Sequence, residues 1–72
     1  MKKIKKIKIK ANGKIKFIPN NYKMSDLIKN LKIPIKKVAI ELNQEIIDKK
    51  NINKINLKKD DRIEIVHFIG GG

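Results

Sequence analysis

One segment with the periodicity of a helix lies between two regions in which apolar and polar residues alternate as they do in β-strands. The apolar positions of this segment are spaced i, i+3, i+4 and i+7: Met24, Leu27, Ile28 and Leu31. This spacing predicts one apolar face on a helix of two to three turns, with Met24 as a core residue. Pro34 prevents the helix from continuing beyond about Lys32. A single apolar helix face needs one face of a sheet to cover it.

The chain has 72 residues, which predicts one small domain that buries only roughly 60% of its unfolded surface. It contains no cysteine, which excludes a disulfide framework, a Cys-ligated zinc site and a catalytic thiol. No stretch approaches the ~20 apolar residues of a membrane span, and the basic start "MKKIKKIKIK" lacks the apolar core of a signal peptide. We therefore expect a cytoplasmic protein. A basic membrane anchor is the alternative for this start, but Ile7 and Ile9 alternate with lysines at the period of a strand.

The region before the helix predicts a β-hairpin, because "ANG" separates the alternating segments "IKIK" and "KIKFI". A two-residue loop would place Ile9 opposite Lys16 and so mix core and solvent faces. A three-residue loop would place Ile9 opposite Ile15. On this ground we expect the three-residue loop, with Gly13 in the left-handed conformation. Pro19 ends the second strand, since it has no N–H for the ladder.

The region after the helix predicts three further strands in an α+β, β-grasp arrangement. "VAIELNQEII" indicates a second hairpin that turns near Asn43-Gln44, and "RIEIVHF" indicates the last strand. Between them, "DKKNINKINLKKDD" reads as a connection with a short helical turn, held to the core by Ile52, Ile55 and Leu57. We expect a four- to five-stranded mixed sheet wrapped around one α-helix, with the first and last strands central and parallel. The periodicity alone does not fix the strand order.

The net charge of +12 raises the possibility of nucleic-acid binding. Eighteen of the nineteen basic residues are lysine and only Arg62 is arginine, whereas readout of base edges favours the guanidinium group. The three aromatic residues, Phe17, Tyr22 and Phe68, are too few and too scattered for an obvious stacking platform. The composition therefore favours a solvated basic surface, and a nucleic-acid-binding module is kept as the alternative.

Two apolar side chains stand on the face of the last strand that should be wet. Arg62 and Glu64 mark this face as solvent-exposed, yet Val66 and Phe68 follow on the same phase. Such side chains indicate a contact for another protein. A second small core layer under the long connection explains them equally well, and both interpretations stay open.

The sequence offers no catalytic constellation and no metal site. His67 is the only histidine and lacks a second ligand or a nucleophile nearby, so we expect a structural role at the end of the strand. The seven acidic residues are scattered, without a pair placed for acid–base catalysis. We therefore expect neither an enzyme nor a bound cofactor.

The remaining feature is the end of the chain, where Gly70, Gly71 and Gly72 follow an apolar strand. We interpret residues 1–69 as the folded domain and residues 70–72 as a flexible tail. A carboxylate on glycine is unhindered, and with two more glycines behind it the tail can enter a channel too narrow for any Cβ. If a partner enzyme adenylates this carboxylate with ATP, a sulfur donor can attack the resulting anhydride and leave a thiocarboxylate.

The segments "VAIELNQEII" and "LKKDDRIEIVHFIGGG" resemble the ThiS sulfur carriers of thiamine biosynthesis, a family with a ubiquitin-like β-grasp fold. The likeness covers nearly the whole chain and is strongest over residues 38–72. Its most specific element is the pair Gly71-Gly72 directly after an apolar strand on so short a domain. Two residues depart from the family pattern, because Lys32 and Asp60 stand where many relatives carry glycine.

The resemblance implies a cycle with three partners: an E1-like adenylyltransferase of the ThiF type, a sulfur donor enzyme and a thiazole synthase of the ThiG type. It also implies that Gly72 is adenylated and then converted to a thiocarboxylate, and that Val66 and Phe68 face the partners. A molybdopterin-synthase small subunit and a tRNA-thiolation carrier share this fold and tail. They remain alternatives, although the short chain and the "IGGG" ending favour the thiamine pathway.

Overall fold

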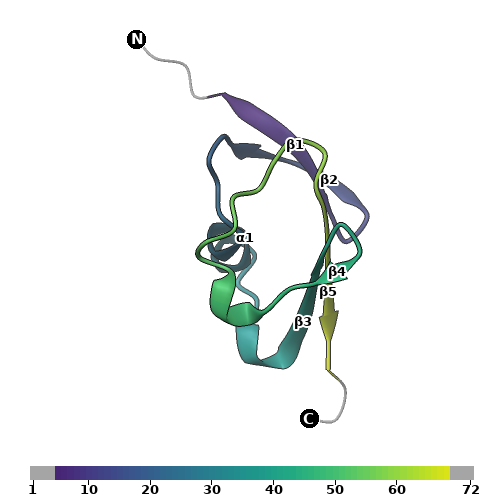
Figure 1. Cartoon of the computed structure of the whole chain (residues 1–72). Coiled ribbons are helices and arrows are strands. Elements are labelled where there is room, and N and C mark those ends of the chain that lie inside the picture. The colour runs from purple at the N-terminus through teal and green to yellow at the C-terminus, as the bar shows by residue number, and fades with distance from the viewer. Residues whose placement is uncertain (1–4, 69–72) are drawn as a thin grey trace.

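The computed structural model describes residues 5–68, which form a five-stranded sheet with one α-helix on one of its faces (Figure 1). The strands and helices follow the predicted order, with a short 3₁₀ helix before the third strand and another after the fourth. In chain order they are β1 (Lys6–Ala11), β2 (Lys14–Pro19), α1 (Met24–Asn30), η1 (Ile35–Lys37), β3 (Val38–Leu42), β4 (Glu45–Ile46), η2 (Lys49–Asn51) and β5 (Arg62–His67).

The sheet has the strand order β2-β1-β5-β3-β4, so the last strand lies at its centre. β5 pairs in parallel with β1 and antiparallel with β3, while the two hairpins β1–β2 and β3–β4 are antiparallel. The structure thus confirms the predicted mixed sheet, including the parallel first and last strands. Strand β1 lies beside the central strand, and β2 and β4 form the two edges.

The loop between β1 and β2 has two residues, so the predicted three-residue loop was wrong. Ala11 pairs with Lys14, which leaves only Asn12 and Gly13 to make the turn. Both have left-handed backbone conformations, with φ of 50° and 80°. Positive φ at both central residues is the pattern of a type I′ turn, whose twist matches that of the strands it joins. The prediction that Gly13 is left-handed is confirmed.

The loop prediction failed because it assigned Ile15 and Phe17 to the core. The observed register places Ile9 opposite Lys16, the mixed pairing that the prediction rejected. As an edge strand, β2 contributes one buried side chain, Ile18, and turns Ile15 and Phe17 to solvent with 58% and 65% of their surface exposed. Turn chemistry therefore outweighed the burial of two apolar side chains.

The core lies between α1 and the inner face of the sheet. Met24 and Leu27 of the helix are fully buried, which confirms Met24 as a core residue, and Leu31 is partly buried. Opposite them lie buried side chains from four strands and the connection: Ile9, Ile18, Val38, Ile40, Leu57, Ile63 and Ile65.

The start of α1 has none of the usual capping residues at its N-cap position. Lys23 occupies the N-cap position and its side chain makes no capping hydrogen bond. Its backbone N–H instead donates to Oδ2 of Asp26, three residues on, at 2.9 Å. The carboxylate also lies in the first turn, where the helix dipole favours negative charge.

The connection before β5 packs against the start of the helix, as expected. Leu57 is buried, Ile52 and Ile55 are partly buried against the core, and η2 is the short helical turn that the sequence predicts. Backbone N–H groups of Met24 and Ser25 donate to the carbonyls of Ile55 and Ile52, at 2.9 and 3.0 Å. The connection therefore supplies acceptors for amides that a helix start leaves unpaired.

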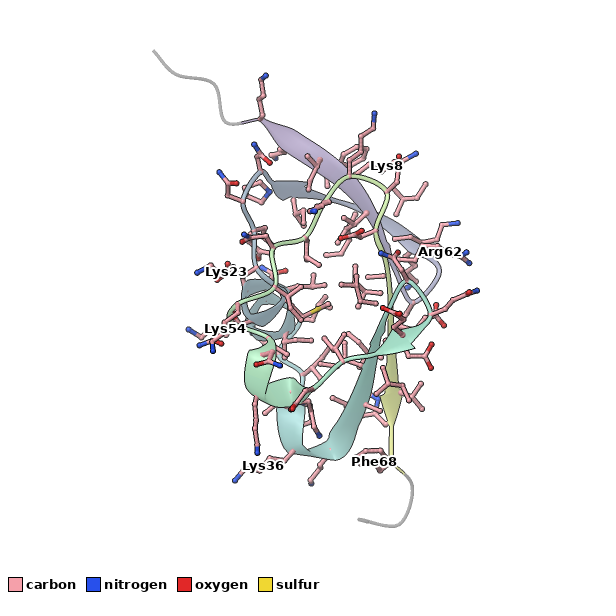
Figure 2. The ribbon with its side chains drawn as sticks, viewed as in Figure 1. Lys8, Lys23, Lys36, Lys54, Arg62 and Phe68 are labelled. Atoms are coloured by element: carbon pink, nitrogen blue, oxygen red, sulfur yellow. The ribbon has the colours of Figure 1, made fainter. Side chains whose placement is uncertain are left out.

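Basic side chains surround the folded body. Figure 2 shows Lys8, Lys23, Lys36, Lys54 and Arg62 pointing away from it in different directions. No helix within residues 5–68 is long and apolar enough to cross a membrane.

Candidate functional site: the end of the last strand

Two asparagine side chains hold β5 in place from both sides. Asn12, in the β1–β2 turn, accepts a hydrogen bond from the N–H of Ile65 at 2.7 Å. Asn43, in the β3–β4 turn, accepts one from the N–H of Arg62 at 2.9 Å and donates to the carboxylate of Asp61 at 3.0 Å. Both asparagines have positive φ, a conformation that this residue tolerates better than most. Each turn therefore also fixes the central strand.

Val66 and Phe68 lie at the end of β5, with 54% and 47% of their surface exposed. Neither belongs to the core cluster. Val66 pairs with Ala39 of β3, and Ile46 on the neighbouring edge strand is 76% exposed. The sheet thus presents exposed apolar side chains on β5 and β4. A role for Val66 and Phe68 in partner contact stays a prediction.

Phe68 is held by two contacts from distant parts of the chain. Its backbone N–H donates to the carbonyl of Lys37 at 2.9 Å. The ammonium group of Lys49 lies 5.4 Å from the centre of its ring, within the range of a cation–π interaction. Figure 2 shows Phe68 where the described chain ends. These two contacts therefore fix the position of Phe68 at the end of the described chain.

Lys49 also donates hydrogen bonds to two backbone carbonyls of the segment that joins η1 to β3. Its Nζ donates to the carbonyl of Ile35 at 3.0 Å and to that of Val38 at 2.8 Å, on either side of the junction between η1 and β3. Sequence reasoning missed this residue, because nothing in the local pattern distinguishes one lysine of the connection from its neighbours. The contact becomes visible only when η2, η1 and the end of β5 are brought together.

His67, which we expected to be structural, is exposed and pairs with Val38 across the sheet. Among residues 5–68, no group of three His, Asp or Glu side chains is placed to hold a metal ion. The remaining predicted site residues, Gly70, Gly71 and Gly72, lie outside the described residues, as does the boundary between domain and tail.

The two departures from the expected glycine pattern both fall on left-handed residues. Lys32, directly after the cap of α1, has φ of 56°, and Asp60, in the turn before β5, has φ of 69°. Glycine adopts this conformation without the steric cost that a Cβ brings. Both positions therefore hold a residue with a Cβ in a conformation that glycine adopts at lower cost.

One helix packed on a five-stranded mixed sheet, with parallel first and last strands, places the molecule among the ubiquitin-like β-grasp proteins. The model of the ThiS family matches residues 4–72, and the chain belongs to that family. The resemblance noted in the sequence is thereby confirmed.

Individual relatives agree with this assignment. The chain is 38% identical over 65 residues to the sulfur carrier protein ThiS of Bacillus subtilis, covering 89% of this chain and 98% of that protein. The crystal structure of the thiamine biosynthesis protein ThiS from Geobacter metallireducens matches with a TM-score of 0.77 at 26% identity, covering 92% of this chain and all of that one. A thiazole synthase of Magnetococcus marinus is 35% identical over 66 residues, 92% of this chain but only 20% of the synthase.

Proposed function

We propose that this protein is a sulfur carrier for thiamine biosynthesis and that the carboxylate of Gly72 carries the sulfur. The observation that supports this most is the match to the sulfur carrier ThiS of Bacillus subtilis, which extends over 98% of that protein. The carrier acts as a cosubstrate of partner enzymes and not as an enzyme, in keeping with the lack of a catalytic constellation in the sequence.

The proposed chemistry begins with an E1-like adenylyltransferase of the ThiF type, which binds the ATP. An oxygen of the Gly72 carboxylate attacks the α-phosphorus of ATP, and pyrophosphate leaves. A sulfur donor enzyme then delivers sulfur at the oxidation level of sulfide to the acyl carbon, and AMP leaves with the bridging oxygen. The product is a Gly72 thiocarboxylate. We also place the carrier in the cytoplasm, where ATP is available to the activating enzyme.

A thiazole synthase of the ThiG type is the proposed acceptor of this sulfur. Two relatives named thiazole synthase, at 35% and 33% identity, each contain a segment that matches 92% of this chain within one fifth of their own length. A carrier-like segment within the synthase polypeptide supports a direct exchange between the two. The same match favours the thiamine pathway over molybdopterin synthesis or tRNA thiolation.

The end of β5 is the proposed contact surface. Val66 and Phe68 meet the partner, while Gly70 and Gly71 enter its channel and bring Gly72 to the reacting atoms. The partly exposed side chains of Val66 and Phe68 supply apolar area for binding. Glycine suits a narrow channel because it has no Cβ.

Substitution of Gly71 by Val tests the threading step. We expect the variant to keep its free energy of unfolding, because chain ends add little to stability. We expect it to lose carrier-dependent exchange of pyrophosphate into ATP by the activating enzyme, since the branched side chain blocks the channel. The unmodified carrier, measured in the same assay, is the control. Normal exchange by the folded variant would contradict the threading role.

A further inference from the structure

The open edge of β2 presents unpaired backbone groups beside two exposed apolar side chains. Within residues 5–68, β2 pairs with β1 alone. Antiparallel pairs alternate between hydrogen-bonded and non-hydrogen-bonded positions, and the pair that closes a two-residue hairpin loop is hydrogen-bonded. Ala11 and Lys14 are that pair here. The N–H of Asn20 donates to the carbonyl of Lys5 at 2.8 Å, as this alternation requires.

The same alternation decides where the backbone groups of Ile15 and Phe17 point. These residues stand opposite Lys10 and Lys8, in the non-hydrogen-bonded positions. Their N–H and C=O groups therefore point away from β1, toward the open edge. Their side chains lie on the outer face of the sheet, 58% and 65% exposed. A second strand laid along this edge would gain both hydrogen bonds and apolar contact.

The surroundings of this edge are strongly basic. On the outer face, a hollow of about 240 Å³ adjoins Ile15. The charged residues of its lining are three cations and one acid, and the whole lining consists of Lys8, Ile9, Lys10, Ile15, Asp60 and Arg62. On the inner side of β2, Lys14 and Lys16 alternate with the two apolar residues. The single carboxylate, Asp60, already lies 3.8 Å from the Nζ of Lys8.

These lysines disfavour a second copy of the chain as the occupant. Pairing two β2 edges would bring Lys14 and Lys16 of one copy close to those of the other, and like charges across strands are destabilising. Each copy also carries a net charge of +12, which adds long-range repulsion. Lysine on an edge strand is a known protection against self-association. A strand with acidic side chains is instead attracted by Lys14 and Lys16, because unlike charges on neighbouring strands stabilise the pairing.

We propose that the open edge of β2 binds, by strand addition, an extended segment of a partner protein in which apolar and acidic residues alternate. The apolar side chains of the segment pack beside Ile15 and Phe17, and its carboxylates face Lys14 and Lys16 on the other side of the added strand. The strand order places β1 between this edge and β5. The edge is therefore separate from Val66 and Phe68, and the proposal does not depend on the carrier function.

A peptide titration tests this proposal directly. The probe is a short peptide of alternating Val and Glu, blocked at both ends, added to the ¹⁵N-labelled full chain. We expect chemical-shift changes concentrated on β2, and amide exchange at Ile15 and Phe17 slowed at least about tenfold at saturation, because strand addition protects these N–H groups. We expect a peptide of alternating Val and Lys not to bind.

Charge reversal gives the most specific variant. In the double variant Lys14→Glu and Lys16→Glu, the preference should switch, so that the Val–Lys peptide binds and the Val–Glu peptide does not. Replacing Ile15 and Phe17 by Thr keeps strand propensity but removes apolar area, and should weaken binding of the Val–Glu peptide by about tenfold. Ile46→Thr, at the other edge of the sheet, is the matched control and should leave binding unchanged.

Four results would overturn the proposal. The first is that the Val–Glu peptide does not bind the unmodified protein, and the second is that its chemical-shift changes map to Val66 and Phe68. The third is a folded charge-reversal variant whose peptide preference does not switch. The fourth is equal binding of a peptide that has the same residues in scrambled order. Tighter binding of a single-stranded oligonucleotide at the β2 amides would assign the edge to nucleic acid. Concentration-dependent dimers in sedimentation would assign it to a second copy. If a variant does not fold, the peptide arms on the unmodified chain still decide.

Discussion

Within residues 5–68, six residues other than glycine adopt positive φ, and they differ in how well they suit it. Asn12, Asn21 and Asn43 belong to the residue type that tolerates this conformation best after glycine. Lys32 and Gln44 have longer side chains and no such advantage, and Asp60 is intermediate. Strain is therefore located at the positive-φ residues other than asparagine, and a substitution to glycine can relieve it at one position at a time.

Lys32→Gly should therefore stabilise the protein. The residue follows the cap of α1 with φ of 56°, and glycine relieves a steric cost of about 1 kcal/mol there. We expect the free energy of unfolding in urea to rise by about this amount. The matched control is Lys29→Gly in the last turn of the helix, which should lower it by about 1 kcal/mol. A loss of stability in both variants would contradict the assignment of strain to Lys32.

Lys49→Met should destabilise the protein by about 1–3 kcal/mol, because the carbonyls of Ile35 and Val38 lose a charged donor. Thermal unfolding measures the change. Its control, Lys50→Met, removes an exposed lysine and should stay within about 0.5 kcal/mol of the unmodified protein. Equal effects of the two substitutions would show that the Lys49 contacts add nothing.

At the scale of elements, the sequence predicts the helices and strands whose formation follows from apolar periodicity. It does not predict the features that depend on contacts between distant parts of the chain. The helix, both hairpins, the connection and the last strand follow from apolar spacing. The β1–β2 loop was mispredicted because burial was assumed for Ile15 and Phe17, and only the strand order shows β2 to be an edge. The hydrogen bonds from the helix start to the connection, and the contacts of Lys49, depend on distant partners that no local pattern reveals.

The end of β5 yields a prediction at this scale. Phe68→Ala should weaken binding to the activating enzyme by about tenfold or more, because an aromatic anchor is removed from the proposed contact. Phe68 as a residue is 47% exposed, so we expect only a modest loss of stability. Isothermal titration and a melting curve measure the two effects. Phe17→Ala, at another exposed phenylalanine, should affect this binding less. A large fall in melting temperature would assign Phe68 to the core instead.

For the molecule as a whole, the proposed function gives the folded body and the end of the chain separate tasks. The body is small and carries a net charge of +12, with basic side chains pointing in many directions (Figure 2). The central position of β5 in the sheet lets the body hold the strand that leads to the glycines (Figure 1). Sequence alone identifies the glycines and the family resemblance, whereas the support of β5 by Asn12 and Asn43 required the structure.

Self-repulsion is the expected consequence of the charge. Salt should stabilise the protein, because at about 0.15 M ionic strength charges more than ~8 Å apart are largely screened. We expect the melting temperature to rise as sodium chloride is added up to about 0.5 M. A melting temperature that falls over this range would show that favourable ion pairs outweigh the repulsion.

The central claim is that Gly72 carries sulfur, and intact-mass spectrometry tests it most directly. The protein is incubated with ATP, the activating enzyme and a sulfur source, with a parallel sample that lacks ATP. The account predicts that one oxygen is replaced by one sulfur, that fragmentation places the change at Gly72, and that the change requires ATP. The activating enzyme is first shown to modify the Bacillus subtilis carrier in the same assay. An unchanged mass of the present protein under those conditions would contradict the account.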